Sequence, residues 1–271
     1  MLTHVRKACI VLSLVLVFVF AFSACGTKPL PWDGKTLRIG VDDSYPPMEF
    51  RDDKNALVGF DVDMAKAIAQ KLGVPIKWTS IVFTGIFAGL DTNKYDIIIS
   101  SVSMTKSREK KYLFSEPYLS NGQEIVVAPS NNSITKIEDL KGKKVGVQSG
   151  TTAENSAKKY NKKFKFTIVP YDQIIQPFAD LKTGRLDAVV SDAMVAEDYA
   201  AKDAKSYKIS GVKMTNEPIA ICMTKVNTDL QTKINKALDE LRADGTLKKI
   251  SEKWYFGKDA TSNIDTSVTE D

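Results

Sequence analysis

Three groups of polar residues between Ser101 and Asp192 have the chemistry to hold a free amino acid. The first, which ends at Arg108, follows an apolar run of isoleucines and combines hydroxyls with a guanidinium group that suits a carboxylate. The second, Gly150-Thr151-Thr152, follows a predicted strand and opens a predicted helix, so its free backbone N–H groups favour an anion. The third, Asp192, ends a predicted strand and can accept hydrogen bonds from an ammonium group. Together the three groups fit both charged ends of an α-amino acid.

Each group taken by itself has a simpler explanation. An arginine in a Ser/Lys-rich segment is usually solvated, Gly-Thr-Thr is often only a helix cap, and an aspartate after a strand is commonly the N-cap of the next helix. All three groups nevertheless come at the carboxyl ends of predicted strands in an alternating β/α pattern. Open α/β sheets bind their ligands at these ends. The coincidence favours a binding site.

The amino terminus predicts export. Arg6 and Lys7 precede an apolar stretch from Ala8 to Phe22 and then small residues, which is the order found in an export signal. The stretch is too short and wrongly flanked for a membrane span. Because a cysteine follows the small residues, the segment resembles a bacterial lipobox. We expect a lipoprotein signal peptide at 1–24 and a lipid anchor on Cys25, with an ordinary secretory signal as the alternative.

Residue counts exclude several classes of function. The only histidine, His4, lies in the signal, so the mature chain has no Ser-His-Asp or Cys-His system and no His-ligated metal site. We expect neither a metal nor a cofactor. Cys9 also lies in the signal and Cys25 is the anchor, which leaves Cys222 as a core residue without a disulfide partner. Lys and Arg number 38 against 33 Asp and Glu, and the lysines are dispersed, which argues against nucleic acid.

Strand and helix patterns alternate along the chain and predict an α/β fold with parallel sheets. In the first part we expect strands at 36–41, 76–81 and 96–100, with helices at 61–72 and 85–92. Asp61 is the expected N-cap of the first helix. A second set of the same kind has strands at 144–147, 166–169 and 187–191, and helices from 153, at 172–182 and from 193.

Two extended segments, near 124–128 and 219–223, flank the second set. A domain inserted through two crossing strands would leave a cleft between two lobes and a two-strand hinge. Residues beyond 258 are rich in Ser, Thr and acids and have no apolar period, which is typical of a loose end. We therefore predict a tether at 25–35, lobe 1 at 36–124 and 220–258, lobe 2 at 125–219 and a flexible tail at 259–271.

Several motifs carry a family resemblance over nearly all of residues 36–258. They are Leu37 to Phe50, Gly59-Phe-Asp-Val-Asp-Met64, Tyr95 to Arg108, Phe114-Ser-Glu-Pro-Tyr118, Gly150-Thr-Thr152 and Gly184-Arg-Leu-Asp-Ala188 with Asp192. As a set, they resemble the bacterial extracellular solute-binding proteins of family 3 that serve polar amino-acid ABC transporters. The resemblance implies a two-lobed, type II periplasmic-binding-protein-like fold, in which helices flank the sheet of each lobe and a two-strand hinge joins the lobes.

The resemblance also implies roles for the three polar groups. In the family, the arginine that matches Arg108 and the backbone at the position of Thr152 hold the ligand carboxylate. Positions that match Ser101, Ser103 and Asp192 bind its ammonium group. Our prediction places Ser101 and Asp192 at the ammonium group, and it places Ser103 with Arg108 and Thr152 at the carboxylate.

For the ligand side chain, the family pocket draws on loops of the first lobe, where this chain has Asp42, Tyr45 and Phe83. The two rings would sandwich a planar or aliphatic group, with cation–π attraction to arginine or lysine, and the acid would accept from its far end. The alternative is two core aromatics and a turn cap. Glutamine-type members carry lysine at the position of Gln148, which disfavours glutamine. Glu49 is a further acid near the pocket.

These features predict an amino-acid-binding lipoprotein of an ABC importer outside the cytoplasm. It would capture a basic L-amino acid between closing lobes and deliver it to a membrane permease. A glutamine or cystine binder and a sensing lipoprotein remain alternatives. A further alternative is a cyclohexadienyl-dehydratase-like enzyme that uses Glu49, although Asp192 argues against it because a prephenate-like substrate lacks an α-amino group. We expect no enzymatic activity and, since a moving cleft suits it, a monomer.

Overall fold

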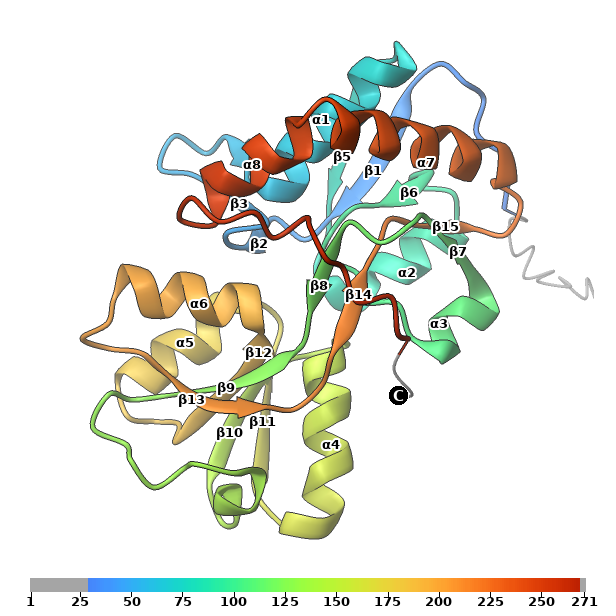
Figure 1. The fold of residues 1–271 in the computed structure, drawn as a ribbon. Coiled ribbons are helices and arrows are strands. Elements are labelled where there is room, and N and C mark those ends of the chain that lie inside the picture. Colours follow the sequence, from blue (N-terminus) through green and yellow to red (C-terminus); the bar gives the residue numbers. More distant parts are fainter. Residues whose placement is uncertain (1–28, 269–271) are drawn as a thin grey trace, which may run out of the picture.

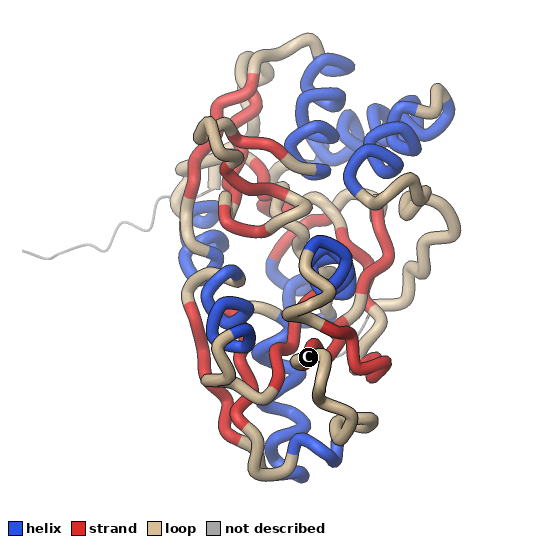
Figure 2. The backbone as a smooth tube through the Cα atoms, turned by 90° about the vertical axis from the view of Figure 1, so that its left-hand side faces the viewer, coloured by secondary structure: helices blue, strands red, loops and turns tan. Residues whose placement is uncertain are grey.

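The computed structural model describes residues 29–268, so the predicted signal peptide and Cys25 lie outside the described residues. Two lobes, each with its own five-stranded sheet, are joined by extended segments (Figure 1). Seen from the side, the lobes lie one above the other (Figure 2). This is the two-lobed α/β architecture that the sequence predicts. No helix within residues 29–268 is long and apolar enough to cross a membrane.

The sheet of the first lobe has the strand order β5-β1-β6-β15-β7, in which β5, β1 and β6 run parallel and β15 runs antiparallel to its neighbours. Ile97 packs with α1 and α7 on one face, whereas Ile98 packs with α2 on the other. Successive strand residues point to opposite faces, so both isoleucines are buried because both faces are covered. The elements are β1 (Leu37–Val41), β2 (Ser44–Tyr45), β3 (Glu49–Arg51), β4 (Leu57–Val58), α1 (Phe60–Leu72), β5 (Ile76–Ser80), α2 (Phe83–Asp91), β6 (Ile97–Ile98), α3 (Lys106–Lys111), β7 (Tyr112–Phe114), β15 (Cys222–Thr224), α7 (Thr228–Ala243) and α8 (Thr246–Trp254).

The sheet of the second lobe repeats this plan with the order β11-β10-β12-β9-β13. Again three strands are parallel and the fourth runs antiparallel to its neighbours. Val189 packs on the side of α5 and α6, and Val190 packs on the side of α4. The elements are β9 (Gln123–Val127), a short 3₁₀ helix η1 (Ile137–Leu140), β10 (Lys144–Gln148), α4 (Thr152–Phe164), β11 (Thr167–Tyr171), α5 (Ile175–Lys182), β12 (Ala188–Asp192), α6 (Ala193–Lys202) and β13 (Lys208–Lys213).

Two paired strands form the hinge. β8 (Leu119–Asn121) and β14 (Glu217–Ile219) pair antiparallel between the lobes (Figure 1). β8 leads into β9 of the second sheet, and β14 leads into β15 of the first. At Gly122 a Cβ atom would lie 2.1 Å from the carbonyl oxygen of Thr215. The two crossing segments, at Gly122 and Thr215, therefore lie too close together here for any residue with a side chain at position 122.

The start of α1 corrects one prediction. The helix begins at Phe60, and its N-cap is Gly59, whose φ of 134° suits glycine. Asp61, the expected N-cap, lies buried in the first turn. Its Oδ2 accepts hydrogen bonds from the backbone N–H of Ser101 at 2.8 Å and from the hydroxyl of Tyr118 at 3.0 Å. The carboxylate is engaged by neighbouring loops instead of by the helix.

The segment after α8 runs beside the hinge, although the sequence pattern predicts a flexible tail from residue 259 (Figure 1). The backbone N–H of Asp265 donates to Ser120 Oγ in β8 at 2.6 Å. Its carboxylate accepts from the amide of Asn216, just before β14. Asp265 thus contacts both of the segments that cross between the lobes.

Candidate functional site

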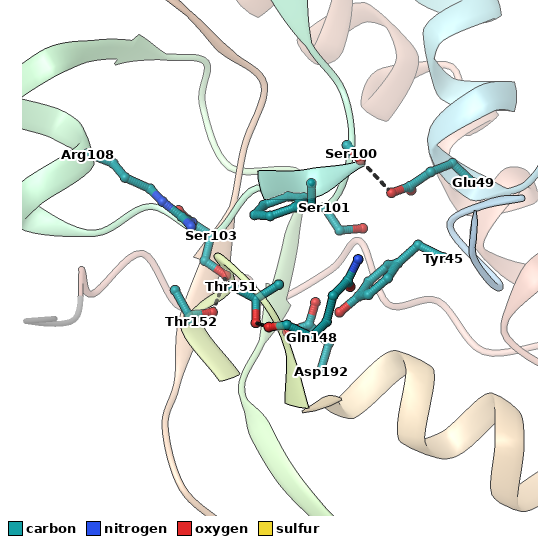
Figure 3. A pocket seen from close by; sticks show the side chains of 11 residues that line it. Tyr45, Glu49, Ser100, Ser101, Ser103, Arg108, Gln148, Thr151, Thr152 and Asp192 are labelled. Carbon is teal, nitrogen blue, oxygen red and sulfur yellow. Dashed lines mark hydrogen bonds between the residues drawn. The ribbon is translucent and has the colours of Figure 1, made fainter. Parts of the chain in front are cut away.

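A pocket lies between the lobes, lined by side chains from both (Figure 3). The free volume among them is about 10 Å³, about as much as one water molecule needs. Every predicted ligand contact lines it except Asp42. The lining residues are Tyr45, Glu49, Phe83, Ser100, Ser101, Ser103, Arg108, Gln148, Thr151, Thr152 and Asp192. Within residues 29–268 no cluster of three or more His, Cys, Asp or Glu side chains could hold a metal ion.

Arg108 makes contacts within its own lobe and one across the pocket, where Nη2 donates to the carbonyl oxygen of Gly150 at 3.5 Å. It lies in α3, whose N-cap Thr105 accepts from the backbone N–H of Arg108. The Nη1 atom donates to the carbonyl oxygen of Ser103 at 2.9 Å, and the guanidinium carbon lies 5.0 Å from the ring centroid of Phe87 and 5.9 Å from that of Phe83. A planar fork anchored in this way can pair with a carboxylate.

The two threonines of the second polar group have different roles. Thr151 is the N-cap of α4, and its hydroxyl accepts from the backbone N–H of Glu154. The simple explanation, a helix cap, therefore holds for Thr151. Thr152 is the first residue of α4, and its Oγ1 lies 3.4 Å from Ser103 Oγ of the first lobe. A helix N-terminus and a hydroxyl thus face the pocket close to Arg108, where a carboxylate is favoured.

Asp192 is the last residue of β12 and occupies the N-cap position of α6, but its side chain makes no capping hydrogen bond to that helix. Its Oδ1 instead accepts from Gln123 Nε2 at 2.6 Å. Burial raises the pKa of Asp192 to about 6 and the charge of Glu217 adds to this, while hydrogen bonds from Tyr45 and Gln123 lower it. A nearby ammonium group would favour the charged carboxylate.

The first lobe holds a chain of buried acids below the pocket. Ser100 Oγ donates to Glu49 Oε1 at 2.7 Å and accepts from the backbone N–H of Asp42 at 3.0 Å. Burial raises the pKa of Glu49 well above its usual value, and the charge of Asp61 adds to this. Burial also raises the pKa of Asp61 to about 6. Two adjacent buried carboxyl groups do not both ionise readily, so one proton is shared between them.

Asp42 lies behind the pocket wall. Its Oδ2 accepts from Gln148 Nε2 of the second lobe at 2.6 Å, and its Oδ1 accepts from Ser44 Oγ at 2.7 Å. Burial raises the pKa of Asp42, although both hydrogen bonds lower it. Tyr45 and Phe83 belong to hydrophobic core clusters and also line the pocket, so the two interpretations of these rings describe different faces of them.

Sequence reasoning missed three residues of this network: Ser100, Asp61 and Gln123. Ser100 is a direct neighbour of a predicted residue, so its position in the sequence was a usable signal. Asp61 was recognised only as a helix cap. Gln123 gave no signal, because it meets Asp192 only through the pairing of β9 with β12.

Residues 37–258 match the family described as bacterial extracellular solute-binding proteins, family 3. The L-cystine-binding protein TcyJ of Escherichia coli (strain K12) is 35% identical over 227 residues, which are 83% of this chain and 84% of that protein. A solved structure of an ancestral arginine-binding protein bound to arginine is similar with a TM-score of 0.78 and 45% identity, and the match covers 81% of this chain and 98% of that one.

A second similar structure is AncCDT-1, an ancestral amino acid-binding protein described as a precursor of cyclohexadienyl dehydratase. Its TM-score is 0.76 at 38% identity, and the match covers 81% of this chain and 95% of that one. These likenesses confirm the predicted type II, two-lobed fold. The chain belongs to the bacterial extracellular solute-binding proteins, family 3, among the amino-acid-binding proteins of ABC transporters.

Proposed function

We propose that the protein captures a basic L-amino acid (arginine, lysine or histidine) between its lobes and delivers it to the permease of an ABC importer. The observation that carries this proposal is a single pocket that combines Arg108, the N-terminus of α4 and Asp192. These groups complement the carboxylate and the ammonium group of an amino acid. Ser103 lies at the carboxylate end, and Ser101 lies at the ammonium end.

The proposed side-chain end of the pocket lies toward Asp42, Tyr45 and Phe83. The rings offer faces for a planar guanidinium or an aliphatic chain. Asp42, held by Gln148, adds negative charge behind this wall. Arginine in the similar ancestral structure supports a cationic ligand. The cystine-binding relative and a similar ancestral arginine-binding protein that is solved with glutamine make cystine and glutamine the competitors.

Closure of the two lobes would assemble this site. Arg108 and Tyr45 come from one lobe and Thr152 and Asp192 from the other, so a ligand that touches all four stabilises the closed arrangement. A small zwitterion with every polar group paired can reach micromolar affinity, about 8 kcal/mol. A lipid on Cys25 would keep the protein next to the membrane permease, and a monomer suffices for the closure.

The test is isothermal titration of the mature chain without its lipid, after unfolding and refolding to remove amino acid carried through purification. The ligands are L-arginine, L-lysine, L-histidine, L-glutamine and L-cystine, with L-citrulline as the neutral counterpart of arginine. We expect arginine to bind at least about tenfold more tightly than citrulline, because each factor of ten corresponds to about 1.4 kcal/mol. Tight binding of cystine or glutamine alone would contradict the proposal of a basic ligand. It would leave intact the proposal that Arg108, Thr152 and Asp192 hold the carboxylate and the ammonium group.

A second candidate, an enzyme, is favoured by one observation. Glu49 is a buried acid in the pocket wall whose raised pKa suits proton donation, and one similar structure is described as the precursor of a dehydratase. Asp192 opposes this candidate, because it would face the carbonyl group of a prephenate-like substrate. Incubation with prephenate or arogenate, followed by detection of the aromatic product, decides between the two.

A further inference from the structure

Gln123 contacts both of the groups that the second lobe offers to an amino acid. Its Nε2 atom donates to Asp192 Oδ1 at 2.6 Å and lies 3.1 Å from Thr152 Oγ1, to which it also donates. An amide nitrogen carries two N–H bonds, so one donor serves each partner. The side chain is fully buried.

The backbone places this side chain at the junction of hinge and lobe. Gln123 is the first residue of β9, directly after the crossing at Gly122, and it is paired with Asp192 in the ladder between β9 and β12. Its N–H donates to Thr215 Oγ1 at 2.8 Å, and its carbonyl oxygen accepts from the N–H of Met214 at 2.7 Å. Both backbone groups of Gln123 are therefore held by the second crossing segment, at Met214 and Thr215.

Chemistry determines which end of the amide faces Asp192. If the amide were reversed, its Oε1 would stand 2.6 Å from a carboxylate oxygen, and two acceptors would repel each other. The carboxylate therefore requires the nitrogen on its side. Gln123 has no freedom to present an acceptor to these two groups.

We propose that Gln123 is a positioning residue that makes Thr152 a hydrogen-bond donor and fixes the orientation of the Asp192 carboxylate for the ligand. Because Thr152 Oγ1 accepts from the amide, the hydroxyl proton points elsewhere, toward a carboxylate held by Arg108. Because Asp192 Oδ1 accepts from the same amide, and Tyr45 also donates to this carboxylate, the acid is held facing the pocket, where it can receive an ammonium group. This inference rests on the proposed capture of an amino acid and deepens it, since Gln123 would link both ends of the ligand through one side chain.

The test uses Gln123→Met, which keeps the length and volume of the side chain and removes both donors. L-Arginine is the first probe, and the remaining amino acids of the panel above are titrated in the same way. We expect a loss of affinity of about 10- to 100-fold, as for a hydrogen bond to a charged group. Gln231→Met is the matched control, because the amide of Gln231 donates to the carbonyl oxygen of Phe114, away from the pocket. The control should bind like the wild type.

A double-mutant cycle separates positioning from general packing. Thr152→Val removes the hydroxyl, and combined with Gln123→Met it should cost clearly less affinity than the two single losses added together, because both disturb one unit. Full additivity would overturn the proposal, as would wild-type affinity in Gln123→Met. If the wild type binds none of the amino acids, the proposed function itself fails, which is a different result.

Gln123→Glu provides a second variant of almost unchanged shape. At pH 7.5 its carboxylate would face Asp192 and repel it, so the affinity should fall. Near pH 5 a protonated Glu can donate again, so the ratio of its affinity to that of the wild type should rise. A ratio that stays constant between these pH values would contradict the donor role, and melting curves of each variant establish that it is folded.

Discussion

The two lobes share one strand plan but bring different chemistry to the pocket. In both sheets three parallel strands are followed by a fourth that runs antiparallel to its neighbours. The first lobe adds long side chains: a guanidinium from α3, two rings from β2 and α2, and buried acids. The second lobe adds short polar groups, Thr152 and Asp192, directly at the ends of its elements. The same scaffold thus supplies two halves of a site.

The difference teaches how recognition can be divided. Short groups at strand and helix ends are placed by backbone geometry, and they suit the parts that every amino acid has in common. Longer side chains vary in length and charge, and they suit the part that differs between amino acids. On this interpretation the second lobe recognises the backbone of the ligand together with Arg108, Ser101 and Ser103, and the rings and acids of the first lobe select its side chain.

Charge is also distributed differently. Glu49 and Asp61 in the first lobe share their environment with each other, so burial raises both pKa values. Asp192 in the second lobe has its own donor, Gln123, and a second acid, Glu217, at the hinge. We therefore expect Asp192 to respond to a cationic group and the pair of acids to respond mainly to pH.

The largest effect is expected for Arg108→Ala, which tests the groups proposed to hold the parts that all amino acids share. The ligand carboxylate would lose a charged partner and remain buried, so the affinity for every amino acid that binds should fall by about 100-fold or more. Arg108→Lys keeps the charge without the fork and should recover part of the loss. Titration calorimetry measures both variants. Near-native affinity in Arg108→Ala would remove the carboxylate from this end of the pocket.

Asp192→Asn should separate stability from binding. The unfolded chain releases this proton near the usual pKa of 3.8, whereas the folded protein keeps it to about 6, so the free energy of unfolding falls as pH rises between these values. Each pKa unit corresponds to about 1.4 kcal/mol. Without added amino acid, the variant should melt at a higher temperature than the wild type at pH 7.5 and at a similar one near pH 4.

The same variant should bind more weakly at pH 7.5, by about 10- to 100-fold, because an amide carries no charge for the ammonium group. In the wild type, affinity should fall as pH drops below about 6, since Asp192 becomes protonated. Affinity that is constant from pH 5 to 8 in the wild type would show that Asp192 does not meet the ammonium group.

Asp42→Asn tests the part of the site proposed to select the ligand side chain, and its expected effect is smaller. The amide oxygen can still accept from Gln148, but the negative charge behind Tyr45 is lost. Affinity for L-arginine should fall by about tenfold, and affinity for L-citrulline should hardly change. The ratio of the two dissociation constants is the measurement. An equal loss for both ligands would make Asp42 a structural residue.

Glu49→Gln should have the smallest effect of the series. Glu49 Oε2 and Asp61 Oδ1 accept no hydrogen bond from an N–H or O–H group of the described residues, and a shared proton supplies what they lack. The amide of glutamine can donate in its place, so arginine affinity at pH 7.5 should be unchanged. A loss of about tenfold would show that Glu49 meets the ligand as a charged carboxylate.

Much of the fold could be predicted, because strand and helix periods are local. The alternation of elements indicated two β/α units, and Thr152 and Asp192 lie at one edge of the second sheet because neighbouring parallel strands end there. Arg108 comes from the other lobe and meets them only across the pocket. The contact of Gln123 with Asp192 could not be predicted, since it depends on an antiparallel pairing between residues 69 positions apart. The position of Asp42 behind Gln148 likewise depends on how two separate lobes meet.

The sequence by itself determined the period of each element, the type of group at each strand end and the absence of histidine outside the predicted signal. Only the tertiary structure decided which of those groups face one another. It placed the side chain of Asp192 against a glutamine instead of the N–H groups of the following helix, and it brought Asp265 to Ser120 in β8 and to Asn216 just before β14. The physical reason is range: backbone periodicity arises between neighbours, whereas hydrogen bonds across lobes form only where the packed hinge brings distant residues together.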